Sequence, residues 1–487
     1  MKCKVFFGCF LILLMSLSLV VPVSAEELLK KDFQNESFEK TIDYFEYARA
    51  WALLHGLPKP PDDWHSNVYV TYVNKTGLQM LYTGLCNISL ADQAFLTIPM
   101  QSILLRYKTE QSNIDTLVAS SFLMIMGFND TENSIYDNSP DRNDTLWASF
   151  SFGVNLEEIF PNLNLPSFSS KSETYPLTPS SDGLTWEWGM KYTNLTALWI
   201  TTHITQENET VVNRPWGLAT YDELTFKYTL NIDPVTHKAT ISQDFCIGRM
   251  RDLWVFGGWF LIWPIYNHYN STGCYRYGEK VSDETIYTFL GTNNIKMSIV
   301  EFQTSVMLDR TTYCTSATGK NVTDNEVFVS DSSISTYAED GELIFNTNFG
   351  IKENYNLYNY TRNPEEIVSE EYVAIARTSN LTDFTHNQDL LKYHRNFAKY
   401  LPLILIHMYP NLYQKAKETI TDITRSDCLF LISYPNYSGY RVEHDPVFTI
   451  YYAPSTIPAT GLGFGILILI ALFAFLASAL LIVLRRV

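Results

Sequence analysis

Hydrophobic and polar residues alternate with a period of two along much of this chain. In the stretch 225–232 the even positions are Phe, Tyr, Leu and Ile, and the odd positions are Thr, Lys, Thr and Asn. The stretches 185–192, 343–351 and 447–452 alternate in the same way. One-sided alternation is typical of antiparallel sheets with one buried and one solvated face. The pattern therefore predicts a mainly β protein with an antiparallel, sandwich-type exterior.

Turn residues divide these predicted strands. Asn74-Lys75-Thr76-Gly77 separates the strand-like stretches 68–73 and 78–85, which predicts a hairpin. Asp233-Pro234 likewise precedes a strand-like stretch at 238–245.

Two segments have helical rather than strand spacing. A short N-terminal helix is predicted from Ser37 to His55, where apolar residues recur every three or four positions and Ser37 can cap the start. Helical spacing returns between residues 387 and 423, where Pro402 ends one predicted helix and Pro410 opens a second. The sequence thus predicts a helical insertion within the β-rich exterior.

The two ends of the chain carry targeting patterns. Residues 1–25 combine an N-terminal basic region, an apolar stretch and a small-residue cleavage site at Val23-Ser24-Ala25, as in a secretory signal peptide. Residues 462–484 carry no charge and would form a helix of about 34 Å, enough to cross a bilayer. Arg485 and Arg486 follow, as expected on the cytoplasmic side. These patterns predict a single-pass membrane protein with its N-terminus outside and its C-terminus in the cytoplasm.

Composition shifts suggest how the exterior is organised. The stretch 159–183 is rich in Pro and Ser and is predicted to be a loop or linker. The predicted segments are therefore a signal peptide at 1–25, an N-terminal α+β region at 26–158, the linker at 159–183, a β-rich main exterior domain at 184–455, a transmembrane helix at 462–484 and a cytoplasmic tail at 485–487.

Glycosylation sequons support an extracellular location. The chain contains twelve Asn-x-Ser/Thr sequons, about twice the number expected by chance from its composition. The predicted acceptors are Asn35, Asn74, Asn87, Asn129, Asn143, Asn194, Asn208, Asn270, Asn321, Asn359, Asn380 and Asn436.

Charge limits the possible binding partners of the chain, and the cysteine count limits its possible disulfides. The chain has 35 basic and 52 acidic residues and a net charge of −17. Such a surface repels phosphate backbones, so no nucleic-acid partner is expected. Five of the seven cysteines lie beyond the signal peptide. They could form two disulfides with one spare thiol, in which case Cys246–Cys274 would close the shortest loop. The alternative is five buried free thiols.

No catalytic motif emerges from the sequence. It contains no HExxH metal motif, no GxSxG elbow and no phosphate-binding P-loop, so no catalytic, metal or cofactor residues are assigned. His394 and the other histidines are interpreted as surface residues, and Glu443-His444-Asp445 as a solvated turn. A pair of carboxylates for glycoside hydrolysis stays open, because such residues need closeness in space rather than in sequence.

An aromatic run suggests a contact surface. Residues 253–266 form an apolar run that carries Trp254, Trp259 and Trp263 and is too short to span a bilayer. The run is interpreted as a buried core segment. Its alternative is a patch that contacts sugar, protein or membrane, favoured by the long sequon-free gap between Asn208 and Asn270.

The C-terminus is similar to the sorting signals of sortase and archaeosortase substrates. Ile457-Pro458-Ala459-Thr460-Gly461 resembles the LPxTG motif, with Ile in place of its Leu, and an apolar span and a basic tail follow. The resemblance implies cleavage between Thr460 and Gly461, but a retained membrane anchor is the favoured interpretation. The acidic, sequon-bearing, Tyr-rich exterior resembles exported surface proteins of archaea.

Together these features lead to one functional hypothesis and one alternative. The hypothesis is a membrane-anchored, N-glycosylated surface protein with a non-enzymatic binding or envelope-structural role. Its expected partners are membrane lipid and envelope proteins or glycans. The alternative is a membrane-tethered extracellular glycoside hydrolase or related hydrolase.

Overall fold

A computed structural model gives the fold of most of the predicted exterior. It describes residues 32–43, 45–46, 49, 62–90, 94–96, 99–108, 113–129, 145–151, 171–200, 203–205, 208–212, 216–257, 280–281, 295–308, 312–322, 327–328, 333–338, 343–348, 355–358, 367–371, 374–378, 428–434 and 441–452. Strands make up 77% of the interpretable region and pair antiparallel, so the prediction of a mainly β, sandwich-like exterior is confirmed.

The strands differ widely in length. A 3₁₀ turn, η1 (Asp32–Gln34), precedes them. They are β1 (Ser37–Ile42), β2 (Trp64–Lys75), β3 (Leu78–Leu90), β4 (Ala94–Leu96), β5 (Met100–Lys108), β6 (Asn113–Asn129), β7 (Thr145–Ser151), β8 (Lys171–Pro179), β9 (Thr185–Ile200), β10 (His203–Thr205), β11 (Asn208–Val212), β12 (Trp216–Asp233), β13 (Lys238–Ile247), β14 (Met250–Gly257), β15 (Lys280–Val281), β16 (Ile295–Leu308), β17 (Thr312–Ser316), β18 (Asn321–Val322), β19 (Val327–Phe328), β20 (Ser333–Ala338), β21 (Leu343–Asn348), β22 (Tyr355–Tyr358), β23 (Ile367–Glu371), β24 (Ala374–Thr378), β25 (Cys428–Tyr434), β26 (Arg441–His444) and β27 (Val447–Tyr451).

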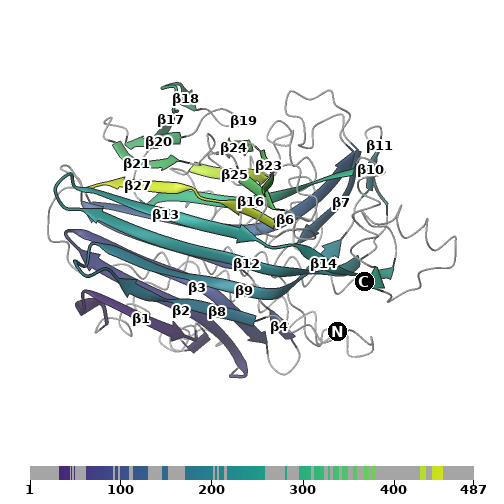
Figure 1. Ribbon diagram of the computed structural model, residues 1–487, viewed down its shortest axis with the longest axis horizontal. Coiled ribbons are helices and arrows are strands. Elements are labelled where there is room, and N and C mark those ends of the chain that lie inside the picture. The colour runs from purple at the N-terminus through teal and green to yellow at the C-terminus, as the bar shows by residue number, and fades with distance from the viewer. Residues whose placement is uncertain are drawn as a thin grey trace.

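These strands form one continuous sheet and one small hairpin (Figure 1). One run of pairings follows the order β1-β2-β3-β5-β6-β16-β25-β24-β19. A second follows β8-β9-β12-β13-β27-β21-β20-β17-β18. Strand β7 pairs with both β6 and β9 and so joins the two runs, and β10 and β11 form the separate hairpin.

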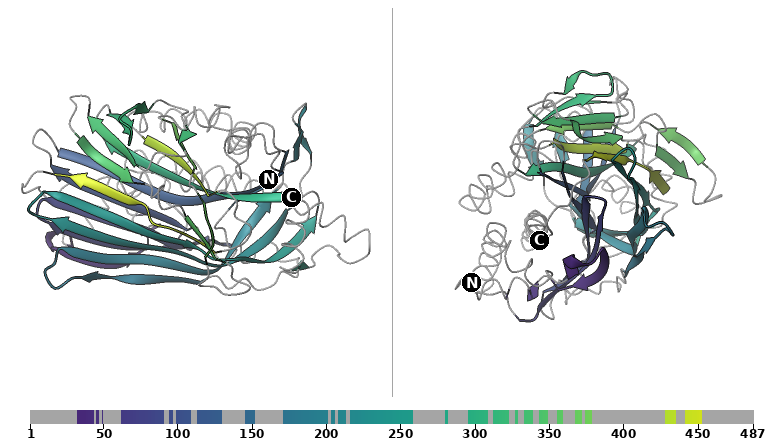
Figure 2. Two further views of the ribbon diagram at one scale, coloured as in Figure 1. Left: turned by 45° about the horizontal axis from the view of Figure 1, so that its top comes forward. Right: turned by 90° about the vertical axis from the view of Figure 1, so that its left-hand side faces the viewer.

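The sheet curves so that its two runs face each other (Figure 2). Tyr82 on β3 meets Trp188 on β9 with ring centroids 5.8 Å apart, and it meets Tyr228 on β12 at 5.4 Å. Trp188 and Tyr228 stack at 5.6 Å, and all three side chains are buried. Buried aromatic pairs of this kind each contribute about 1 kcal/mol beyond the burial of their area.

Alternation along β9 and β12 determines which side chains enter this core. The predicted inner-face residues are all buried: Trp186, Trp188, Met190 and Tyr192 on β9, and Phe226, Tyr228, Leu230 and Ile232 on β12. Their neighbours in sequence lie on the opposite, outer face, because successive side chains of a strand point to opposite sides.

A small polar network lies within this aromatic core. The buried amide of Gln101 accepts a hydrogen bond from the hydroxyl of Tyr82 and donates one of 3.0 Å to the hydroxyl of Tyr192. Tyr192 in turn donates to the carbonyl of Leu85 at 2.5 Å. The network links β3, β5 and β9 and satisfies polar groups that would otherwise be costly to bury.

The predicted β2–β3 hairpin is present with a two-residue turn. Lys75 pairs with Leu78, so Thr76 and Gly77 form the turn, with φ angles of 50° and 91°. Two successive positive φ angles are typical of the turns that match the twist of a hairpin. The β12–β13 hairpin at Asp233 is also as predicted.

The predicted helix at 37–55 is wrong over its first six residues. Residues 37–42 form strand β1, which pairs with β2, so that Phe38 lies opposite Tyr72 and Ile42 opposite Val68. Phe38 and Ile42 fit helical spacing, but pairing with a distant strand outweighs this local preference. Helical backbone occurs only later, at residues 45, 46 and 49 among those described.

The predicted loop at 159–183 is also partly wrong. Strand β8 occupies residues 171–179 and pairs with β9. Its register shifts between Tyr175 and Thr178, on either side of Pro176. A proline is tolerated there because the described pairings place β8 at a sheet edge.

Several other predicted elements lie outside the described residues. These are the signal peptide at 1–25, the helical insertion at 387–423, the transmembrane segment at 462–484 and the tail at 485–487. Within the described part of the chain, no helix has the length and apolar character needed to cross a membrane.

Candidate functional site

The structure places five of the twelve sequon asparagines with their side chains. Asn35 and Asn321 are exposed, and Asn74, Asn87 and Asn194 are half-buried. Asn129 and Asn208 lie on β6 and β11, with side chains outside the description. Asn143, Asn270, Asn359, Asn380 and Asn436 lie outside the described residues altogether. Each acceptor whose side chain is described thus has access to solvent.

Two of these acceptors occupy special backbone positions. Asn74 is the next-to-last residue of β2, close to the hairpin turn, and its peptide N–H donates to the carbonyl of Glu36 at 2.7 Å. Asn194 lies within β9 with a φ of 52°, a left-handed conformation that Asn tolerates better than most residues. The left-handed backbone conformation at position 194 is therefore a structural reason for an asparagine there.

The predicted aromatic patch is described only in part. Trp254 lies on β14, opposite Leu218 of β12 and Lys280 of β15. Trp259 and Trp263 lie outside the described residues, as do Thr460 and Gly461 of the predicted sorting motif. Both the contact patch and the cleavage site therefore stay predictions.

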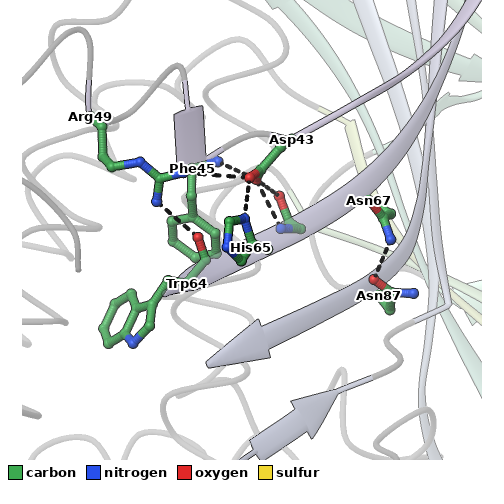
Figure 3. A network of polar contacts seen from close by, with 8 residues as sticks. Asp43, Phe45, Arg49, Trp64, His65, Asn67 and Asn87 are labelled. Carbon is green, nitrogen blue, oxygen red and sulfur yellow. Dashed lines mark hydrogen bonds and ion pairs between the residues drawn. The ribbon is translucent and has the colours of Figure 1, made fainter. Parts of the chain in front are cut away.

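An aspartate–histidine cluster that the sequence did not reveal lies where β1 ends and β2 begins (Figure 3). One oxygen of Asp43 accepts hydrogen bonds of 2.9 Å from the peptide N–H groups of Phe45 and Ser66, and one of 3.3 Å from the Ser66 hydroxyl. The other oxygen lies 2.8 Å from Nδ1 of His65 and 3.5 Å from Arg49. Five groups, from the segment after β1 and from the start of β2, thus converge on one carboxylate.

The cluster holds a solvent-facing imidazole. The side chain of His65 is 57% exposed, whereas that of Asp43 is 15% exposed. A carboxylate bound to one ring nitrogen fixes the orientation of a histidine, as in hydrolase triads and metal sites. The Ser66 hydroxyl donates to the Asp43 carboxylate, whereas the serine of a nucleophilic triad donates to the histidine.

The same cluster also has a clear structural effect. Asp43 caps the helical residues that follow it, since it bonds the N–H two residues ahead. Arg49 donates to the carbonyl of Trp64 at 2.8 Å, and the Phe45 and Trp64 rings meet at 5.7 Å. These contacts fasten the segment after β1 to the start of β2.

A second polar cluster lies on the outer face of β9, β12, β13 and β26. Glu223 pairs with Lys191 at 2.7 Å and with Arg441 at 3.8 Å, and Arg441 also pairs with Glu443. The Arg441 Nε donates to the thiol sulfur of Cys246 at 3.1 Å. These salt bridges connect neighbouring strands. The hydrogen bond to Glu223 raises the pKa of Lys191.

Neither described free thiol is poised to react. Burial raises the pKa of Cys246 to about 12, although Arg441 opposes the rise, and burial raises the pKa of Cys86 to about 11. Both thiols therefore stay protonated at neutral pH, and the thiolate is the reactive form.

The cysteines follow neither predicted scheme. Cys86 and Cys246 are free, so the Cys246–Cys274 pairing is wrong. Cys314 is disulfide-bonded, so the alternative of five free thiols is wrong as well. A core as large as this one can bury free thiols as small hydrophobic residues.

The interpretation of Glu443-His444-Asp445 as a solvated turn is wrong for Glu443 and His444, whereas Asp445 is exposed and lies outside the strands. Glu443 and His444 belong to strand β26, and His444 is 2% exposed, opposite Phe245. Asp43 and His65 were missed because they are 22 positions apart and share no motif spacing. Only the pairing of β1 with β2 brings them together.

No protein-family model matches the chain, and a search of curated proteins found no significant match.

Proposed function

We propose that this chain is a single-pass, membrane-anchored, N-glycosylated cell-surface protein with a non-enzymatic binding or envelope-structural role. The observation that supports the proposal is the placement of the sequons. Each of the five acceptor asparagines whose side chain is described is exposed or half-buried. Buried acceptors would be incompatible with attached glycans, which are bulky and solubilising.

The shape of the described exterior suits such a role. A broad antiparallel sheet presents a large solvated face, and its aromatic core holds that face in a fixed form. Rigid scaffolds of this kind serve adhesion and recognition because the binding surface needs no ordering when a partner arrives.

The experiment uses the full-length chain expressed in a host that glycosylates exported proteins. Asn35→Gln, Asn74→Gln and Asn321→Gln should each lower the mass of the mature protein by one glycan, measured by intact mass spectrometry. Asn67→Gln is the matched control, because Asn67 is exposed but is not in a sequon.

Protease treatment of intact cells tests the location. Protease added from outside should digest the exterior without permeabilising the cells. An unglycosylated chain that resists external protease would refute the proposal.

A further inference from the structure

The outer face of the second strand run carries an uncharged polar row that crosses the sheet. Starting at Thr185 on β9, each residue lies directly opposite the next on a neighbouring strand. The first six members are Thr185, Asn231, Thr240, Thr449, Asn346 and Ser335. Thr315 on β17 and the sequon residue Asn321 on β18 extend the same row. We call this row the Thr/Asn ladder; its strands lie side by side in Figure 1.

The ladder presents hydrogen-bonding groups to solvent. Asn231 is exposed, and most other members are half-buried, while Thr449 is 7% exposed. The hydroxyl of Thr185 donates to Asn231 at 2.8 Å, and the amide of Asn346 donates to Ser335 at 2.9 Å. These contacts hold the amide groups in position and leave further donors and acceptors on the same face.

The absence of charge within the ladder limits what it can bind. The chain as a whole carries a net charge of −17, and charged residues flank the ladder, with Asp233 and Lys238 in the next row. No member of the ladder could neutralise a phosphate or supply a carboxylate to a cation. Ser and Thr are also under-represented among the residues that dominate protein–protein binding. A neutral ligand rich in hydroxyl groups fits these properties.

The spacing of the ladder indicates an extended ligand. Neighbouring strands lie about 4.8 Å apart, so the first six members span about 24 Å. Adjacent strands also rotate by about 20–25° relative to each other, so the row turns by about 100° or more over that length. A rigid flat lattice could touch only two or three strands, whereas a flexible chain can follow the turn.

We infer that the Thr/Asn ladder binds a single chain of a neutral polysaccharide. The polymer lies across the strands, and its hydroxyls exchange hydrogen bonds with successive ladder residues. This inference rests on the proposed function only for the presence of the ladder outside the cell. It names the ligand class for the binding role.

The test is affinity electrophoresis of the full-length chain in detergent, in gels that contain dextran, mannan or a soluble β-glucan. At least one of these polymers should retard the chain, and the acidic polymer polygalacturonate should not. The double variant Thr185→Val/Thr240→Val removes two hydroxyls but keeps the branched side-chain shape. Each lost hydrogen bond weakens binding several-fold, so the apparent Kd should rise about tenfold or more.

The matched control is Thr178→Val, which removes an exposed hydroxyl from β8 outside the ladder and should leave retardation unchanged. Retardation by none of the three polymers, or equal retardation of the wild type and the double variant, overturns the inference. A change in sedimentation coefficient in the double variant without any polysaccharide effect would instead make the ladder an interface between copies. None of the first six ladder members is a sequon asparagine, so their binding by the purified chain tests the inference without relying on glycosylation or location, and this result is separable from a failure of the proposed function.

Discussion

Gly189 offers a sharp test of how closely strand β9 approaches its neighbour β12. It lies on the outer face of β9, between Tyr175 of β8 and Lys227 of β12. The Lys227 ammonium lies 5.0 Å from the centre of the Tyr175 ring, a cation–π contact that passes over the glycine. A side chain at position 189 would enter this space.

The alanine variant should be strongly destabilised because its methyl group would meet backbone atoms. A Cβ built on Gly189 overlaps the carbonyl oxygen of Phe226, and it would lie 2.9 Å from the Cα of Lys227. Restoring the second contact alone to an ordinary 3.4 Å requires a shift of about 0.5 Å between paired strands. That shift weakens about two backbone hydrogen bonds between β9 and β12, together with the stacking of Trp188 on Tyr228. We therefore expect the free energy of unfolding to fall by about 3 kcal/mol.

Urea denaturation of the detergent-solubilised chain, followed by tryptophan fluorescence, measures the loss. Gly319→Ala is the control, because its Cβ would meet nothing within 4 Å and its φ of 79° is the main source of strain. That variant should cost only about 1 kcal/mol. If Gly189→Ala lost no more stability than Gly319→Ala, the close approach of β9 and β12 would be refuted.

Two further predictions follow from the polar clusters. Asp43→Ala should lower the free energy of unfolding by about 2–3 kcal/mol, because it releases a helix cap and a charged hydrogen-bond network, whereas His65→Ala should cost less than about 1 kcal/mol. Similar losses in the two variants by urea denaturation would contradict the central role of Asp43. The raised pKa of Cys246, about 12 against a reference of 9.0, means that the unfolded thiol ionises first as pH rises. Stability should therefore fall above pH 9 by up to about 1.4 kcal/mol per pH unit, and Cys246→Ala should reduce that slope in denaturation curves from pH 8 to 11.

Much of the strand architecture could be predicted from the sequence. The period-two alternation at 185–192 and 225–232 correctly identified which side chains of β9 and β12 are buried. The turn at Asn74–Gly77 was equally clear, because positive φ angles favour particular residues locally. Such features depend on neighbouring positions in the chain, and local sequence therefore specifies them.

Predictions failed where pairing with another strand competes with the local preference of a segment. Residues 37–42 fit a helix in isolation, but each of the six lies opposite a residue of β2 and pairs with that strand. The proline-rich stretch containing β8 became an edge strand because β9 provides a partner on one side. In both cases the free energy of pairing with another strand, which the pattern within the segment does not show, decided the outcome.

The sequence by itself determined the β class of the exterior, the faces of its principal strands and the positions of the sequons, because each depends on residue types at short spacing. Only the tertiary structure decided which residues meet. It brings Asp43 to His65 through the β1–β2 pairing, and Cys246 to Arg441 through the pairing of β13 with β26. It also aligns Thr185 with Asn231 and Thr240 across three strands. Strand register sets these contacts, and register is fixed by the burial of a whole face rather than by any single segment.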